Sequence, residues 1–216
     1  MKAFFKTNSL FFFPYLLFII AGLALIIFDS KAEKHLEFNS YHSSVFDFFF
    51  YYITFLGDGI TAVLVVVLLL AVNYRAAVFV GVSNIIASLV TQILKHTVFA
   101  DVVRPKKYFE GIHDLYLVPG VDNYLYNSFP SGHSTCAFAL YLALALITEN
   151  RIIKFICFVI AFLVGCSRIY LSQHFFEDVF AGSIIGVIFT LMVYYTLNKF
   201  KTEWMSKSVI KLVKRI

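Results

Sequence analysis

The stretch IIKFICFVIAFLVGCSRIYLSQHFFED, residues 152–178, decides the fold class. Its first part, Ile152–Tyr170, is apolar and long enough for a helix to cross about 30 Å of bilayer hydrocarbon. Its second part carries serine, histidine and aspartate where the apolar run gives out. Ionisable groups at the end of a membrane span are costly and for that reason indicate function. The stretch predicts a membrane helix that ends in a polar site.

The composition of the whole chain agrees with a membrane protein. Of 216 residues, 60% are hydrophobic and 14% are charged, against roughly 45–50% and 25% in an average globular protein. The charged residues are too few to cover the surface of a soluble fold. The 26 Phe and 13 Tyr make the chain too hydrophobic to be disordered. The net charge of +5 is spread over short segments between apolar runs, so it indicates topology and no nucleic-acid partner.

Six apolar runs predict an all-α polytopic membrane bundle with six transmembrane helices, folded as one domain over residues 1–216. The first run is longer than a signal-peptide core and is interpreted as an anchor. The fourth is short for a span. The runs are Leu10–Phe28, Ile53–Val72, Ala76–Val98, His133–Thr148, Ile152–Tyr170 and Val179–Leu197.

The distribution of basic residues predicts the orientation. If the N-terminus is cytoplasmic, 11 of the 18 Lys and Arg residues fall on the cytoplasmic side, including six from Lys199 to Arg215. Cytoplasmic loops are enriched in Lys and Arg, so both termini are expected inside and the polar site outside.

Two connections between runs are long. Asp29–Tyr52 contains a cluster of Phe and Tyr that is typical of an interfacial aromatic belt, which is favoured over a substrate site. Phe99–Gly132 is expected to hold a short interfacial helix or a lid. Asp58, between two glycines, marks a helix break inside or next to the second run.

Three polar segments fall on the same predicted side of the membrane, and together they provide a phosphate site. The cations are Lys95, Arg104 and Arg168. The guanidinium group of an arginine can donate two parallel hydrogen bonds to two oxygens of one phosphate. Ser131 and Gly132 stand just before a predicted helix, where free backbone N–H groups and the helix dipole favour anions.

Catalytic groups accompany this site. His174 and Asp178 are four residues apart, so on a helix they share a face, and the carboxylate can orient the imidazole for attack. His133, on another helix, can protonate the leaving oxygen. Nucleophile, orienting carboxylate and acid are all present.

The pattern Pro130-Ser131-Gly132-His133, followed by Ser167-Arg168-x5-His174-x3-Asp178, resembles the type 2 phosphatidic acid phosphatase family of membrane lipid phosphatases, whose site is related to that of vanadium haloperoxidases. The resemblance covers about residues 95–178. It implies that His174 forms a phosphohistidine, that Asp178 supports it, and that His133 protonates the leaving group and then activates water. It also implies phosphate binding without metal or cofactor by Lys95, Arg104, Ser131, Gly132 and Arg168.

One departure from the family concerns Lys95. The family usually has six residues between this lysine and the Arg-Pro pair, whereas eight separate Lys95 from Arg104. In a continuous helix, two extra residues would turn Lys95 away by about 200° and put Thr97 in its place. If the chain instead leaves the helix within residues 99–102, Lys95 keeps its direction. The second alternative is favoured, with Lys106 and Lys107 in reserve.

Two other classes of function remain as alternatives. His133, His174 and Asp178 could bind a metal in a metal-dependent hydrolase, although three nearby cations would repel a dication. A transporter or channel with an anion site would have broken helices near the midplane, whereas here the polar groups lie at helix ends. The interpretation favoured is a phosphatase acting on a lipid phosphate partner in the bilayer: undecaprenyl diphosphate, phosphatidylglycerol phosphate, phosphatidic acid or a lipid A phosphate.

Overall fold

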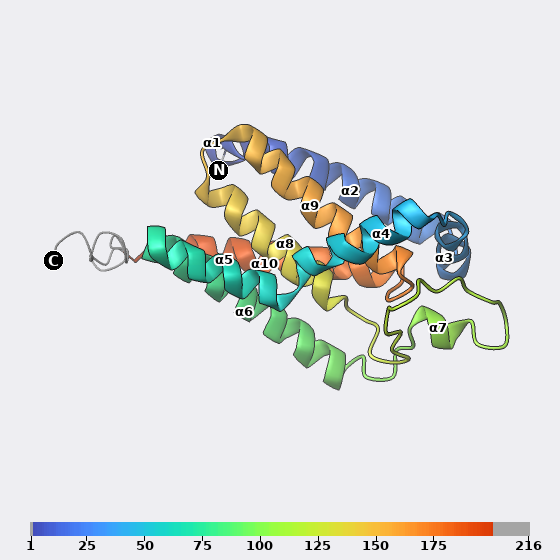
Figure 1. Cartoon of the computed structure of the whole chain (residues 1–216). Helices are drawn as coiled ribbons and strands as arrows, with labels where there is room; N and C mark the ends of the chain where they lie inside the picture. The colour runs from blue at the N-terminus through green and yellow to red at the C-terminus, as the bar shows by residue number, and fades with distance from the viewer. Residues whose placement is uncertain (1, 201–216) are drawn as a thin grey trace.

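The computed structural model describes residues 2–200, and this part of the chain is helical with no strand (Figure 1). Long helices run roughly along one direction, and the short helices α3 and α7 lie with the loops at one end (Figure 1). The helices are α1 (Lys2–Thr7), α2 (Ser9–Phe28), α3 (Lys31–Ser40), α4 (Ser44–Ile53), the 3-10 turn η1 (Thr54–Gly57), α5 (Gly59–Val72), α6 (Tyr74–Thr97), α7 (Pro105–Tyr108), α8 (Gly132–Ile147), α9 (Arg151–Tyr170) and α10 (Phe176–Leu197).

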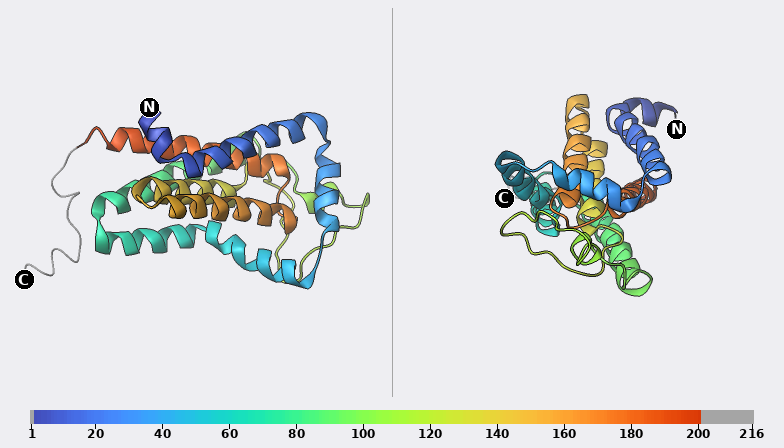
Figure 2. Two further views of the ribbon diagram at one scale, coloured as in Figure 1. Left: turned by 90° about the horizontal axis from the view of Figure 1, so that it is seen from above. Right: turned by 90° about the vertical axis from the view of Figure 1, so that its right-hand side faces the viewer.

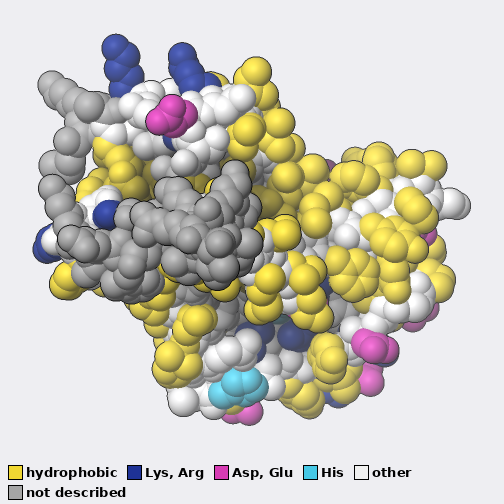
Figure 3. All heavy atoms as spheres, turned by 60° about the vertical axis from the view of Figure 1, so that its left-hand side comes forward, with side chains coloured by type: hydrophobic (Ala, Val, Ile, Leu, Met, Phe, Trp, Pro, Cys, Tyr) yellow, Lys and Arg dark blue, Asp and Glu magenta, His cyan; other side chains and the backbone are white. Residues whose placement is uncertain are grey.

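Helix α8 is the centre of the bundle and packs against α6, α9 and α10 (Figure 2). Its side chains Phe138, Leu140 and Leu142 are fully buried. Because α6, α9 and α10 surround α8, this helix does not itself have to present an apolar face to lipid. The outward faces of the surrounding helices are hydrophobic, as Figure 3 shows for one side of the molecule.

The polytopic helical fold is confirmed, whereas six separate spans are not. Four helices (α2, α6, α9 and α10) are long and apolar enough to cross a membrane, and a fifth span results if α4 to α5 is counted as one bent span. Helix α8, in place of the predicted fourth span, is apolar but only 16 residues long.

The predicted helix break at Asp58 is confirmed, and it divides the run Ile53–Val72 between η1 and α5. The axis bends by 54° between Ser44–Gly57 and Gly59–Val72. Asp58 has extended backbone, and its side chain caps α5 by accepting a hydrogen bond from the backbone N–H of Ile60 at 3.2 Å. An aspartate in this role starts a new helix instead of continuing the old one.

Close approach of α10 to α8 positions the start of α8. A methyl group added at Gly182 would lie 2.6 Å from the carbonyl oxygen of Ser131, and one at Gly186 would lie 2.6 Å from that of Thr135. Glycines four apart allow helix backbones to touch in this way. The two helices are also joined by the Ser131 N–H, which donates to the carbonyl oxygen of Asp178 at 2.9 Å.

The N-terminus of α8, the α9–α10 loop and both long connections lie at one end of the bundle, called here the site end (Figure 1). The Phe99–Gly132 connection contains the expected short helix, α7. Helix α1 and the end of α10 lie together at the opposite end, where the Phe4 ring is 5.4 Å from that of Tyr194. Most of the predicted C-terminal basic cluster falls in residues 201–216, outside the described residues.

Candidate active site

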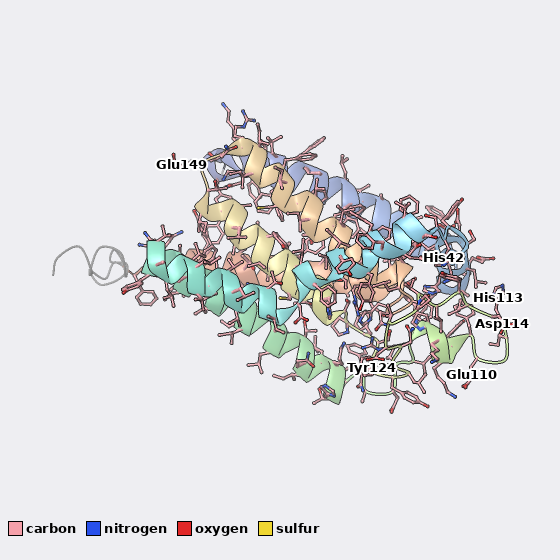
Figure 4. The ribbon with its side chains drawn as sticks, in the orientation of Figure 1. His42, Glu110, His113, Asp114, Tyr124 and Glu149 are labelled. Atoms are coloured by element: carbon pink, nitrogen blue, oxygen red, sulfur yellow. The ribbon has the colours of Figure 1, made fainter. Side chains whose placement is uncertain are left out.

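The structure brings the three polar segments together at the site end. Arg104 comes from the long connection, Ser131 from the cap of α8, and Arg168, His174 and Asp178 from α9, the following loop and α10. All five are buried. The guanidinium carbon of Arg104 lies 5.4 Å from the ring centroid of Tyr124, which is labelled in Figure 4.

His174 and Asp178 form the pair that the sequence predicts. His174 Nδ1 lies 3.4 Å from Asp178 Oδ2, and the same oxygen accepts the backbone N–H of Phe175 at 3.0 Å and the hydroxyl of Ser128 at 2.5 Å. A carboxylate can only accept, so Nδ1 carries the imidazole proton and Nε2 keeps a free lone pair. The contacts fix Asp178 and through it the orientation of His174.

The surroundings of His174 keep its ring neutral. Burial, and then the positive charges of Arg104, Lys95 and Arg168, hold the pKa of His174 well below its usual value. A neutral imidazole at ordinary pH is the form that can attack phosphorus.

Arg104 is held mainly by backbone oxygens. Its Nε donates to the carbonyl of Tyr126 at 2.9 Å, and its Nη1 donates to the carbonyl of Gln173 at 3.1 Å. Its own backbone N–H donates to the carbonyl of Leu125 at 2.8 Å. The long connection thus wraps the guanidinium and directs it towards His174.

Arg168 is held by side chains from distant parts of the chain. Its Nη1 donates to Thr54 Oγ1 at 2.6 Å, and its Nη2 donates to Gln173 Oε1 at 3.3 Å. Its buried Nε has no hydrogen-bond partner among residues 2–200. An N–H group left without a partner in a buried cationic site is a donor available to an anion.

Lys95 faces the cluster. Helix α6 ends at Thr97, and Lys95 is buried, 7% exposed, with Arg104, Arg168 and Asp178 within electrostatic reach. Thr97 is exposed and donates to the carbonyl of Ile93 at 2.7 Å, so it does not take the place of Lys95. The chain leaves the helix after Val98, which is the favoured arrangement.

We expect Lys95→Ala to lower kcat/KM at least about tenfold, because the ammonium is the flexible cation of the cluster. Lys106→Ala and Lys107→Ala should cost only a few-fold. Both lie on α7, where Lys106 is exposed and Lys107 pairs with Glu110. Phosphate-release kinetics of the three variants check this, and a silent Lys95→Ala beside a crippling Lys106→Ala or Lys107→Ala would contradict it.

Ser131, Gly132 and His133 start α8. Ser131 caps the helix, with its Oγ accepting from the Ser134 hydroxyl at 3.0 Å and, at 3.4 Å, from the Ser134 backbone N–H. Gly132 begins the helix. His133 is half-buried, and its ring makes no hydrogen bond to residues in the described range. It lies within electrostatic reach of His174 and the three cations.

Three further residues position the site and were missed from sequence: Ser128, Thr54 and Gln173. Ser128 stands two residues before Pro130, and Gln173 stands directly before His174. Their closeness to the two motifs was a signal in the sequence that they belong to the site. Thr54 gave none, because it is 114 positions from Arg168.

The metal alternative lacks a ligand set in this part of the chain. Within residues 2–200, no three His, Cys, Asp or Glu side chains gather as metal ligands would. Cations surround His174 instead.

Comparisons with known proteins point to one family. A lipid A 1-phosphatase of Rhizobium johnstonii is 37% identical over 67 residues, covering 31% of this chain and 27% of that protein. Phosphatidylglycerophosphatase B of Bacillus subtilis is 39% identical over 75 residues, covering 31% of this chain and 37% of that protein. These matches therefore span well under half of the curated relatives.

Solved structures share the fold over more of the chain. The crystal structure of Aquifex aeolicus LpxE superposes with a TM-score of 0.67 and 27% identity, covering 76% of this chain and 93% of LpxE. A Bacillus subtilis PAP2-type phosphatidylglycerolphosphate phosphatase superposes with a TM-score of 0.56 and 22% identity, covering 92% and 99%. The profile of the PAP2 superfamily matches residues 76–202, which is more than half of the chain and contains every predicted site residue. The chain belongs to the PAP2 superfamily.

Proposed function

We propose that this protein is a lipid phosphate phosphatase that works through a phosphohistidine at His174. The observation that carries the proposal is the neutral, carboxylate-oriented imidazole of His174 surrounded by Lys95, Arg104 and Arg168. A nucleophile among cations suits a phosphoryl group, because the cations neutralise the charge of the phosphoryl oxygens in the transition state.

The reaction proceeds in two displacements. The bound phosphate brings negative charge that offsets Lys95, Arg104 and Arg168, so His133 takes up a proton from water as the substrate binds. His174 Nε2 then attacks phosphorus, the N–P bond forms, and the P–O bond to the lipid breaks as His133 gives this proton to the leaving oxygen. His133, now neutral, then takes a proton from water, whose oxygen attacks phosphorus and breaks the N–P bond. Inorganic phosphate leaves, and both histidines return to their starting states.

The substrate is a lipid because the site lies at the end of apolar helices. A tail can stay in the bilayer while its phosphate reaches the cluster. The names of the relatives, a lipid A 1-phosphatase and a phosphatidylglycerophosphatase, fit this class. The candidates are undecaprenyl diphosphate, phosphatidylglycerol phosphate, phosphatidic acid and lipid A phosphate.

The test is phosphate release by the purified protein in mixed micelles, with each of the four lipids in parallel. We expect turnover of at least one lipid, persistence of activity in excess chelator, and inhibition by vanadate, which mimics a five-coordinate phosphorus. No release from any of the four lipids would sink the proposal. Loss of activity in chelator, with rescue by one divalent ion, would instead favour a metal-dependent hydrolase.

We further propose that the site end faces the cell exterior or periplasm and that both termini are cytoplasmic, in a multi-pass protein of the cytoplasmic membrane. The excess of Lys and Arg on the opposite side supports this orientation. Asp114 and Glu149 are exposed at opposite ends of the bundle (Figure 4). In intact cells, an impermeant thiol reagent should label Asp114→Cys and spare Glu149→Cys; the reverse pattern would place the site in the cytoplasm.

A further inference from the structure

Gln173 connects the two arginines of the site. Its side chain is buried, and Oε1 accepts one hydrogen bond from Arg104 Nη1 and one from Arg168 Nη2, each at 3.3 Å. Its backbone oxygen also accepts from Arg104 at 3.1 Å. A single residue next to His174 therefore contacts both guanidinium groups.

The other end of the same side chain is anchored in the long connection. Gln173 Nε2 donates to the carbonyl oxygen of Asp122 at 2.9 Å and to Asn123 Oδ1 at 2.7 Å. Both ends of the amide are thus engaged. Rotating the side chain away would break all four hydrogen bonds of a buried group, which is costly.

An amide suits this place better than a carboxylate. Two guanidinium groups that converge on one phosphate repel each other, and a shared acceptor is needed to hold them together before substrate arrives. The amide oxygen accepts from both without adding a negative charge. The positive potential of the site therefore remains available to the phosphate.

We propose that Gln173 is a positioning residue that sets Arg104 and Arg168 for phosphate binding and couples them to residues 122–123 of the long connection. The inference rests on the proposed function, since it assigns these arginines to phosphate. Gln173 touches the arginines and need not touch the substrate. Its loss should therefore weaken phosphate binding more than it slows the chemical step.

The experiment compares Gln173→Met with wild type by measuring kcat, KM for the preferred lipid and Ki for vanadate. Met has a similar length and no amide, so we expect KM and Ki to rise about tenfold while kcat stays within about threefold. Asn123→Ala removes one acceptor from Nε2 and leaves Oε1 on both arginines, so we expect KM and Ki to rise about threefold, less than in Gln173→Met, and unchanged constants would overturn the coupling to residues 122–123. Thermal unfolding of each purified variant checks that it is folded.

Folded Gln173→Met with KM and Ki within twofold of wild type would overturn the proposal, as would a loss confined to kcat. If Gln173→Met does not fold, Gln173→Asn replaces it, because the shorter side chain keeps a polar amide in the buried position and cannot reach both arginines from there. Its Ki for vanadate should rise about tenfold, and an unchanged Ki would overturn the proposal.

The role of Gln173 can be tested even if the proposed phosphatase function is wrong. If wild type hydrolyses none of the lipids, thermal stabilisation by inorganic phosphate is measured instead. A smaller stabilisation of the Gln173 variant than of wild type supports the positioning role even then, and equal stabilisation refutes it.

Discussion

His174→Ala should abolish phosphate release, with a loss of at least about a thousandfold in kcat. The variant has no nitrogen at this position to form the bond to phosphorus. The cations of the site would remain and would still bind phosphate. The measurement is phosphate release from the preferred lipid, beside thermal stabilisation by inorganic phosphate as a check that the cations of the site are intact.

His113→Ala is the matched control. His113 is exposed at the site end, and the hydrogen-bond contact of its ring is with the neighbouring carbonyl of Asp114 at 3.0 Å (Figure 4). The kcat of His113→Ala should stay within about twofold of the wild-type value. Release at the wild-type rate by a folded His174→Ala protein would remove His174 as the nucleophile.

Asp178→Asn should lower kcat by about a hundredfold or more. The carboxylate accepts from His174, Ser128 and Phe175 through one oxygen, and an amide in its place cannot balance the positive charge that develops on the imidazole. KM should change less, because the three cations that bind phosphate are kept. Steady-state kinetics over a range of lipid concentration separate the two constants.

Glu177→Gln is the control for this variant, since it changes the adjacent carboxylate. Glu177 pairs with Lys34 of α3 at 2.9 Å and has no hydrogen bond to His174. Its kcat should stay within about threefold of wild type. Similar losses in the Asp178 and Glu177 variants would mean that general charge at the start of α10, and not the orientation of His174, governs the rate.

The fold was predictable where apolar length alone decides it. The run Leu10–Phe28 matches α2 to within one residue, because nothing polar interrupts it. For the second predicted span, hydropathy gives the length and Asp58 marks the break, but neither gives the angle between the two helices. Apolar residues continue through Gly57, yet Asp58 caps a new helix there and the axis turns by 54°.

In the site, local spacing succeeded and long-range contacts did not. The spacing of His174 and Asp178 predicts a contact if both lie on one helix, whereas His174 lies in the loop before α10 and meets Asp178 because this carboxylate reaches back from the first turn to the N-cap. The number of residues between Lys95 and Arg104 could not tell whether the Lys95 side chain points to the site, because its direction relative to Arg104 depends on where α6 ends. Thr54 holds Arg168 through a contact that only the packing of η1 against α9 creates, whereas Gln173 reaches Arg168 from the α9–α10 loop, five positions along the chain. The catalytic roles of these residues stay predictions.

Phosphoenzyme trapping tests the central claim most directly. Purified protein is mixed with lipid carrying a radiolabelled phosphate, quenched in alkali within milliseconds to preserve an N–P bond, and digested for mass spectrometry. The account predicts a labelled, acid-labile peptide that contains phosphorylated His174 in wild type and no label in His174→Ala. Label on a different residue, or rapid phosphate release with no labelled protein under any quench, would contradict a covalent intermediate at His174.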